Sequence, residues 1–253
     1  DILDRNNEIQ QFQNWLIEFE KNKKKNNIKR GVYFYGAPGV GKTFFVFDIL
    51  KKMNYDIINF DAGDIRNKNV IENITKENMS TVNVLSMLQK KKKKIVIIMD
   101  EIDGMNNGDK GGINTLIKLI RPKKTKKQKL EDFTINPIIC IGSYHIDKKI
   151  RELMKVCDVI EIKKPTDLQI QEIINSKNIN LKKEHYDILI KNIDGDLKKL
   201  NNLLNFIESD RNNYVIKNLS DSKIINILCR PKNYNEDTKK ITKKILNNNY
   251  SLN

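Results

Sequence analysis

The sequence predicts an α/β protein in which a parallel five-stranded sheet is flanked by helices and followed by a small all-helical domain. Two observations predict this fold. Five short apolar runs, rich in β-branched and aromatic residues, alternate with helical patterns over the first 164 residues. Such alternation is typical of a parallel sheet covered by helices on both faces. After Pro165 the sequence holds helical periodicity and no further strand pattern, so we expect a domain boundary near Lys164.

The five expected strands are continuous apolar runs, which favours burial on both faces of the sheet. They cover residues 31–35, 56–60, 95–99, 137–142 and 159–162. Helical patterns lie at residues 42–53, 67–77, 81–89, 111–120 and 148–154, and an amphipathic N-terminal helix carries Phe12, Trp15 and Phe19 as expected core residues. Three more helices are expected at residues 166–176, 182–192 and 196–207. We therefore divide the chain into a sheet domain (1–164), a helical lid (165–207) and a tail or truncated third helical domain (208–253).

Basic residues outnumber acidic ones, and the formal net charge is +15 with a sequence pI near 9.5. A surplus of this size favours a polyanionic partner, of which nucleic acid is the commonest. The chain is also rich in Lys, Asn and Ile, as an AT-rich genome would produce, so compositional drift accounts for part of the charge. Three lysine-rich runs adjoin the beginnings of expected strands, and we interpret them as solvated loops; they are residues 21–25, 90–94 and 123–129.

Several classes of protein are excluded by what the chain contains. No apolar run approaches the ~18 residues of a membrane-spanning helix, so we expect no membrane partner. Cys140 lies in an apolar run and is expected to be a buried thiol, and the absence of CxxC pairs favours a reducing compartment. His145 and His185 are the only histidines and have no Cys or Asp at ligand spacing, so a zinc site is not expected.

A glycine-rich segment joins the first expected strand of the sheet to the helix that follows it. It matches G-x-x-x-x-G-K-[ST], and its position between strand and helix is the context in which this motif forms a phosphate-binding loop. The glycines let backbone N–H groups turn toward phosphates, and the helix N-terminus favours anions. The lysine is expected to reach the β- and γ-phosphates, and the threonine hydroxyl to ligate Mg²⁺. The residues of this P-loop are Gly36, Ala37, Pro38, Gly39, Val40, Gly41, Lys42 and Thr43.

Two acidic residues follow the apolar run at residues 95–99. A strand that ends in two acids places carboxylates at the ligand-binding edge of a parallel sheet. We expect Asp100 to hold Mg²⁺ and Glu101 to orient and polarise an attacking water. A carboxylate in that place favours hydrolysis of a nucleoside triphosphate over transfer to a small-molecule acceptor, which makes a simple kinase the least favoured function.

The P-loop, the strand ending in Asp-Glu and the helical lid together resemble the AAA+ ATPases. Three segments resemble the clamp-loader family more closely, in particular the large subunits of replication factor C. Residues 61–68 (DAGDIRNK) resemble its N-A-S-D-T-R-S-K segment. Residues 99–105 (MDEIDGM), with GGI at 111–113 and LIKLI at 116–120, resemble M-D-E-V-D-G-M…G-G-I…L-I-x-L-I. Residues 137–141 (PIICI) resemble the P-I-I-C strand, so the resemblance covers about residues 1–207.

The resemblance implies roles for two further residues at the nucleotide. Sensor 1, which responds to the γ-phosphate, falls on Ser143, where the family has Asn. Sensor 2 falls on Lys198 in Gly-Asp-Leu-Lys, where the family has Arg, and lysine lacks the bidentate fork. The stretch Lys155-Val156-Cys157 holds no arginine finger. The resemblance therefore implies a slow ATPase that receives its finger from a neighbouring subunit.

The resemblance also implies partners. Clamp loaders hold primer–template DNA inside a spiral of AAA+ subunits and open a ring-shaped sliding clamp. The matched segments assign phosphate-backbone contacts to Arg66, Lys68, Lys118 and Arg121, and clamp contacts to part of residues 67–89. Such a protein acts in the nucleus, or in the replication compartment of a large DNA virus. Two alternatives stay open: another AAA+ DNA machine, such as a checkpoint clamp loader or a helicase loader, and a nucleotide-binding scaffold with little turnover.

Overall fold

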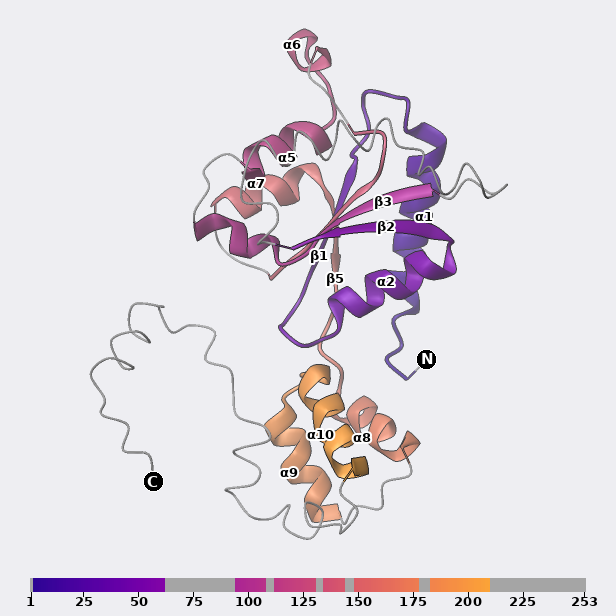
Figure 1. The fold of residues 1–253 in the computed structure, drawn as a ribbon, viewed down its shortest axis with the longest axis vertical. Coiled ribbons are helices and arrows are strands. Elements are labelled where there is room, and N and C mark those ends of the chain that lie inside the picture. Colours follow the sequence, from indigo (N-terminus) through magenta and orange to yellow (C-terminus); the bar gives the residue numbers. More distant parts are fainter. Residues whose placement is uncertain are drawn as a thin grey trace, which may run out of the picture.

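The computed structural model describes residues 2–61, 94–107, 112–130, 134–143, 148–177 and 183–209. These residues form an α/β domain with a sheet at its centre and a helical domain beside it (Figure 1). The expected helices at residues 67–77 and 81–89, and the tail from residue 210, lie outside the described residues. None of the described helices combines the length and apolar composition needed to cross a membrane.

The sheet has five strands, all parallel, in the order β2-β3-β4-β1-β5. The prediction of a parallel five-stranded sheet is confirmed, and each strand begins and ends within one residue of its expected bounds. In this order β3, β4 and β1 are consecutive neighbours. Because they are parallel, the loops that follow these three strands meet at one edge of the sheet. The strands are β1 (Gly31–Tyr35), β2 (Tyr55–Phe60), β3 (Lys94–Met99), β4 (Ile138–Ile141) and β5 (Asp158–Glu161).

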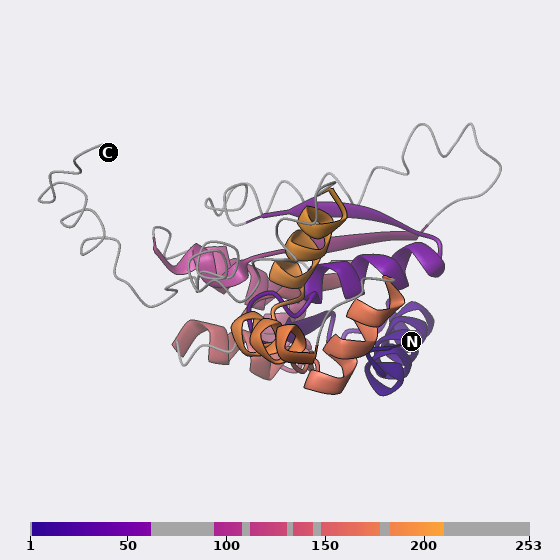
Figure 2. The same ribbon diagram turned by 90° about the horizontal axis from the view of Figure 1, so that it is seen from below.

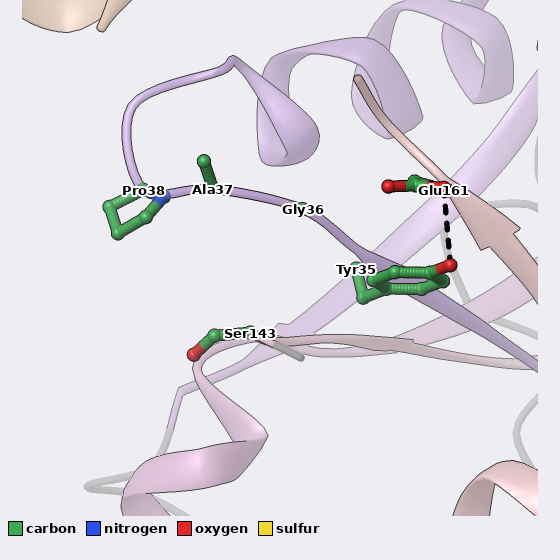
Figure 3. Close-up of a pocket in the computed structure, with 6 residues that line it drawn as sticks. All are labelled: Tyr35, Gly36, Ala37, Pro38, Ser143 and Glu161. Atoms are coloured by element: carbon green, nitrogen blue, oxygen red, sulfur yellow. Dashed lines mark hydrogen bonds between the residues drawn. The ribbon is translucent and has the colours of Figure 1, made fainter. Parts of the chain in front are cut away.

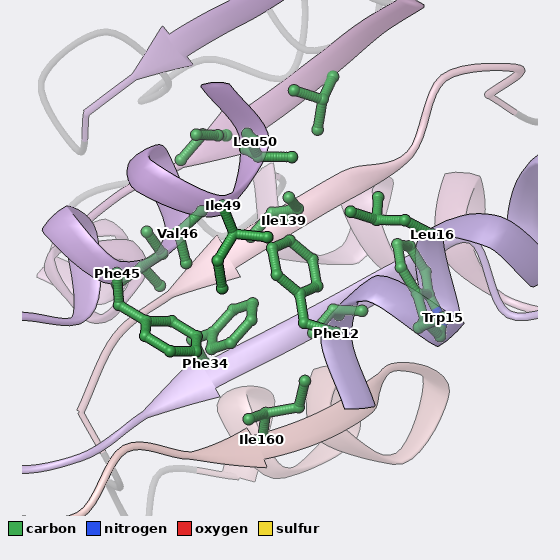
Figure 4. Close-up of a cluster of buried hydrophobic side chains, with 14 of the residues drawn as sticks. Phe12, Trp15, Leu16, Phe34, Phe45, Val46, Ile49, Leu50, Ile139 and Ile160 are labelled. Carbon is green, nitrogen blue, oxygen red and sulfur yellow. The ribbon is translucent and has the colours of Figure 1, made fainter. Parts of the chain in front are cut away.

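Helices cover both faces of the sheet, as Figure 2 shows from below. On one face α1 (Asn6–Asn22) and α2 (Lys42–Lys52) enclose a core that includes Phe12, Phe34 and Phe45, whose rings meet edge to face (Figure 4). On the other face α5 (Gly112–Ile120) and α7 (Lys148–Val156) pack against Tyr33 and Cys140. Trp15 and Cys140 are buried, as predicted. Continuous apolar strands follow from this double coverage.

The helical domain consists of α8 (Asp167–Ser176), α9 (Lys183–Ile193) and α10 (Leu197–Ser209). It has a core of its own, built from aliphatic side chains of all three helices. Helix α8 begins at a capping box, in which the Thr166 hydroxyl accepts from the Gln169 N–H and the Gln169 side chain accepts from the Thr166 N–H. This cap accounts for the entry of the chain into the helical domain directly after Pro165.

Two short elements were not predicted. A 3-10 helix, η1 (Ile102–Asn107), follows β3, and α6 (Lys126–Lys129) interrupts the loop before β4.

The prediction that Lys123 lies in a solvated loop was wrong, because this residue is only 2% exposed. Its ammonium donates to the Lys118 carbonyl, and its backbone N–H donates to the Asn26 carbonyl. The lysine is buried because these contacts tie the loop to α5 and to the segment before β1.

Arg30 joins two loops at the edge where the strands begin, the loop before β1 and the loop before β4. It is fully buried, and its guanidinium donates to the carbonyls of Lys23, Lys25 and Thr134 at 2.8, 2.7 and 2.9 Å. Burial lowers the pKa of Arg30 to about 10. We expect Arg30→Met to lower the free energy of unfolding by ~3 kcal/mol, because buried carbonyls lose a charged donor. Urea denaturation measures this effect, with exposed Arg151→Met as the control; a change under ~1 kcal/mol contradicts the assigned role.

Candidate nucleotide-binding site

The expected site residues meet at the edge where β1, β3 and β4 end. The P-loop follows β1, Asp100 and Glu101 follow β3, and Ser143 follows β4. Because these three strands are neighbours in the sheet, their carboxyl ends place the three loops side by side. The structure therefore brings together residues that are more than 100 positions apart in the chain.

The P-loop turns the chain from β1 into α2. Gly41 precedes the helix with φ 85°, a left-handed conformation that glycine adopts without steric cost. Val40 is fully buried and anchors the loop in the core. The Lys42 ammonium donates to the carbonyls of Gly36 and Ala37 at 2.9 and 3.0 Å. Burial lowers the pKa of Lys42, while the negative charges of Asp103 and Asp100 raise it.

Thr43 and Asp100 join the P-loop to the end of β3. The Thr43 hydroxyl donates to Asp100 Oδ2 at 2.9 Å. Two hard oxygen atoms thus converge beside the phosphate-binding loop, and Mg²⁺ prefers such a site, with few protein ligands and several waters or phosphate oxygens. The donor set fits the magnesium ion that the sequence predicts.

Glu101 lies in a strained turn directly after β3. Its φ is 51°, a left-handed value that is uncommon for a residue with a side chain and that clusters at functional sites. Two hydrogen bonds from backbone N–H groups hold the turn: the Asp100 N–H donates to the Phe60 carbonyl, and the Glu101 N–H donates to the Asp100 side chain at Oδ1. The side chain of Glu101 is exposed at the same edge as the P-loop, where the sequence predicts a water-activating carboxylate.

Both the hydroxyl and the backbone carbonyl of Ser143 form hydrogen bonds. Its hydroxyl donates a hydrogen bond to Asp103 Oδ2, and its carbonyl accepts from the Tyr33 hydroxyl at 3.1 Å. Burial raises the pKa of Tyr33, with added contributions from Cys140 and Asp103, so this hydroxyl stays protonated and able to donate. Asp103 had no role in the sequence prediction. Its only signal was its place in the Met-Asp-Glu-Ile-Asp-Gly-Met segment.

A cavity of about 440 Å³ lies between the P-loop and the ends of β1 and β5 (Figure 3). Figure 3 shows Ser143 on one side of it and Ala37 and Pro38 on the other. At its end the Tyr35 hydroxyl donates to Glu161 Oε2 at 3.3 Å. The cavity therefore adjoins the phosphate-binding loop, and Ser143 forms part of its wall.

The helical domain contacts the P-loop through the start of α10. The Leu197 N–H donates to the Gly39 carbonyl at 2.9 Å, and Asp196 caps the helix by accepting from the N–H groups of Lys198 and Lys199 at 3.0 Å. Lys198 is exposed in the first turn of this helix. The expected sensor 2 residue thus belongs to the turn that touches the P-loop.

Arg5, in the N-terminal segment, donates a hydrogen bond to the P-loop. No sequence motif predicted this contact. Arg5 is 8% exposed, and its guanidinium donates to the carbonyls of Val40 at 2.8 Å and Lys163 at 3.5 Å. Burial is the main cause that lowers its pKa, and the nearby charge of Glu8 raises it. Arg5 therefore connects the N-terminal segment, the P-loop and the link to the helical domain.

Two of the four residues that the sequence predicts to contact DNA lie among the described residues. Lys118 is exposed in the last turn of α5, and Arg121 follows this helix and is half-buried. The Ile120 carbonyl accepts from the Arg30 N–H, so both residues lie near the edge where β1 begins, away from the P-loop. Arg66 and Lys68 lie outside the described residues, as does the expected clamp-contacting region.

Known proteins resemble this chain in sequence and in fold. Replication factor C subunit 1 of Saccharomyces cerevisiae is 30% identical over 247 residues, covering 88% of this chain and 27% of that protein. Replication factor C large subunit of Methanococcus aeolicus is 28% identical over 163 residues, covering 64% of this chain and 30% of that protein. The chain thus spans between a quarter and a third of these curated relatives.

A solved structure of the Aeropyrum pernix ORC2 protein, described as ADPNP–ADP complexes, has the same fold. Its TM-score is 0.60 at 11% identity, and the match covers 94% of this chain and 70% of that one. The sequence model of the ATPase family associated with various cellular activities (AAA) matches residues 32–165. This match contains the P-loop, the two acids after β3 and Ser143. The chain belongs to the AAA family of ATPases.

Proposed function

We propose that the chain is the ATP-hydrolysing part of a DNA clamp loader of the large-subunit type. It binds MgATP, opens a sliding clamp and places it on primer–template DNA. The observation that supports this most is the joint geometry of Lys42, Thr43, Asp100 and Glu101 at one sheet edge, in a chain similar to replication factor C large subunits over most of its length.

Each residue has one part in the reaction. The P-loop N–H groups and Lys42 bind the phosphates, while Thr43 and Asp100 hold Mg²⁺. When bound there, Mg²⁺ would supply positive charge to the phosphate groups. Glu101 takes a proton from the attacking water. The start of α10, with Lys198, closes over the P-loop, and an arginine from a neighbouring subunit completes the site.

The partners follow from the same similarity. Arg66, Lys68, Lys118 and Arg121 contact the phosphate backbone, which makes the affinity for primer–template DNA fall steeply with salt. The surplus of positive charge supports a polyanionic partner. We place the activity in the nucleus, because the eukaryotic relatives carry a replication name and eukaryotic chromosomes are replicated there.

The test measures ATP turnover by the full-length protein with its co-purified AAA partner subunits. We expect turnover to rise at least tenfold when a sliding clamp and primer–template DNA are added together, because a neighbour's arginine finger contributes ~10³–10⁵ in related enzymes. Stimulation by DNA alone would favour another AAA+ DNA machine. ATP binding without turnover in the complete assembly would favour a nucleotide-binding scaffold. Either result overturns the proposal.

A further inference from the structure

The Ser143 hydroxyl has a single hydrogen, and in this structure that hydrogen is donated to Asp103. A serine hydroxyl has one donor hydrogen and two acceptor lone pairs. The hydrogen is donated to Asp103 Oδ2, a carboxylate oxygen that can only accept. The oxygen of the same hydroxyl belongs to a side chain that lines the cavity beside the P-loop (Figure 3). Toward the cavity, Ser143 is therefore a hydrogen-bond acceptor.

Independent contacts hold Asp103 in this place. The buried side chain of Ile102 and the hydrogen bond from the Gly104 N–H to the Glu101 carbonyl fix the start of η1. A methyl group at Gly142 would lie 3.2 Å from Asp103 Oδ1 and 2.5 Å from the Tyr33 hydroxyl, so the three groups are closely packed. Burial lowers the pKa of Lys42, and the charge of Asp103 opposes this effect.

We propose that Asp103 is a positioning residue that turns the Ser143 oxygen into an acceptor for the attacking water. The proposal rests on ATP hydrolysis at this site. An asparagine, which the resembling family has at this position, carries both an amide donor and a carbonyl acceptor. A serine can fill the acceptor role in a defined orientation only when another group takes its hydrogen. Asp103 takes that hydrogen.

The resulting step assigns both hydrogens of the water. The water oxygen forms a bond to the γ-phosphorus, and the bond from the γ-phosphorus to the bridging oxygen breaks, leaving its electron pair on ADP. One water hydrogen passes to Glu101 as a proton and from there to the released phosphate. The other stays on the water oxygen and is donated to Ser143 Oγ. The oxygen lone pair is then directed at the γ-phosphorus.

The test is a double-mutant cycle of single-turnover ATP hydrolysis in the assembled protein at saturating MgATP. Asp103→Leu has nearly the size of aspartate and no atom that accepts a hydrogen bond, so it releases the serine hydrogen toward the cavity. We expect about a tenfold loss of rate, the effect of one lost hydrogen bond, and the same loss for Ser143→Ala. The double variant should lose no more than either single variant. In a Ser143→Asn background, Asp103→Leu should cost less than threefold.

Saturating MgATP removes effects that act only through Lys42 and the affinity for phosphate. A second measurement does not depend on turnover: the affinity for MgADP with aluminium fluoride, which imitates the γ-phosphoryl group in the transition state of its transfer to water. Asp103→Leu should weaken this complex about tenfold and leave MgADP affinity unchanged, with no added effect in the Ser143→Ala background. Losses that multiply in the double variant, or a rate that is unchanged or faster in Asp103→Leu, would overturn the inference. Failure of stimulation by clamp and DNA would instead overturn the proposed function.

Discussion

Glu101→Gln should reduce single-turnover ATP hydrolysis by ~10²–10³-fold, the range expected when a general base is removed. The amide has nearly the shape of the carboxylate, so the φ of 51° and the hydrogen bond from the residue 101 N–H to Asp100 Oδ1 stay in place. MgATP affinity should change less than threefold, because Lys42, Thr43 and Asp100 are untouched. Quenched-flow hydrolysis and equilibrium binding of a fluorescent ATP analogue measure the two effects.

The control for this variant is Glu152→Gln, which neutralises an exposed carboxylate on α7 and should leave hydrolysis unchanged. An affinity loss in Glu101→Gln as large as its rate loss would indicate a damaged turn rather than a missing base. A hydrolysis rate equal to that of the unaltered protein would exclude Glu101 as the catalytic base. Another group would then have to activate the attacking water.

The strands were predictable because each is a local signal. A run such as residues 95–99 is apolar throughout, and a strand covered on both faces requires this pattern. Helix α6 was missed because its residues are polar and lysine-rich, although Thr125 and Gln128 form a capping box whose spacing is visible in the sequence. The burial of Lys123 could not be foreseen, since it depends on a contact with Asn26, far away in the chain.

The site was predictable to the extent that a motif carries it. The P-loop and the two acids after β3 are continuous segments with a known spacing, and the structure brings them together. Asp103 and Ser143 meet only because β3 and β4 are neighbours in the sheet. Arg5 reaches Val40 only because α1 packs against β5, the strand next to β1. Such contacts arise from tertiary structure, and a single sequence contains no local trace of them.

Gly39→Ala should separate the helical domain from the P-loop and lower MgATP affinity by ~100-fold. An added methyl group would lie 2.0 Å from Asp196 Oδ1, well inside contact distance. Gly39 also has φ 76°, a left-handed conformation that costs a residue with a side chain ~1–2 kcal/mol. The hydrogen bond from the Leu197 N–H to the Gly39 carbonyl adds ~1 kcal/mol. Together these terms approach ~3 kcal/mol, about two decades of affinity.

The matched control is Gly41→Ala. Gly41 also has a left-handed φ, of 85°, but a methyl group there would meet its nearest neighbour at an ordinary 3.6 Å. Hydrogen–deuterium exchange of the free protein distinguishes the two variants, because the Leu197 amide is protected by Gly39 and not by Gly41. We expect faster exchange at the start of α10 in Gly39→Ala alone. Asp196→Ala removes the overlapping carboxylate, so the loss from Gly39→Ala should be smaller in that background. Equal exchange in both glycine variants would show that strain in the loop, rather than contact with Asp196, decides how the helical domain closes over the nucleotide.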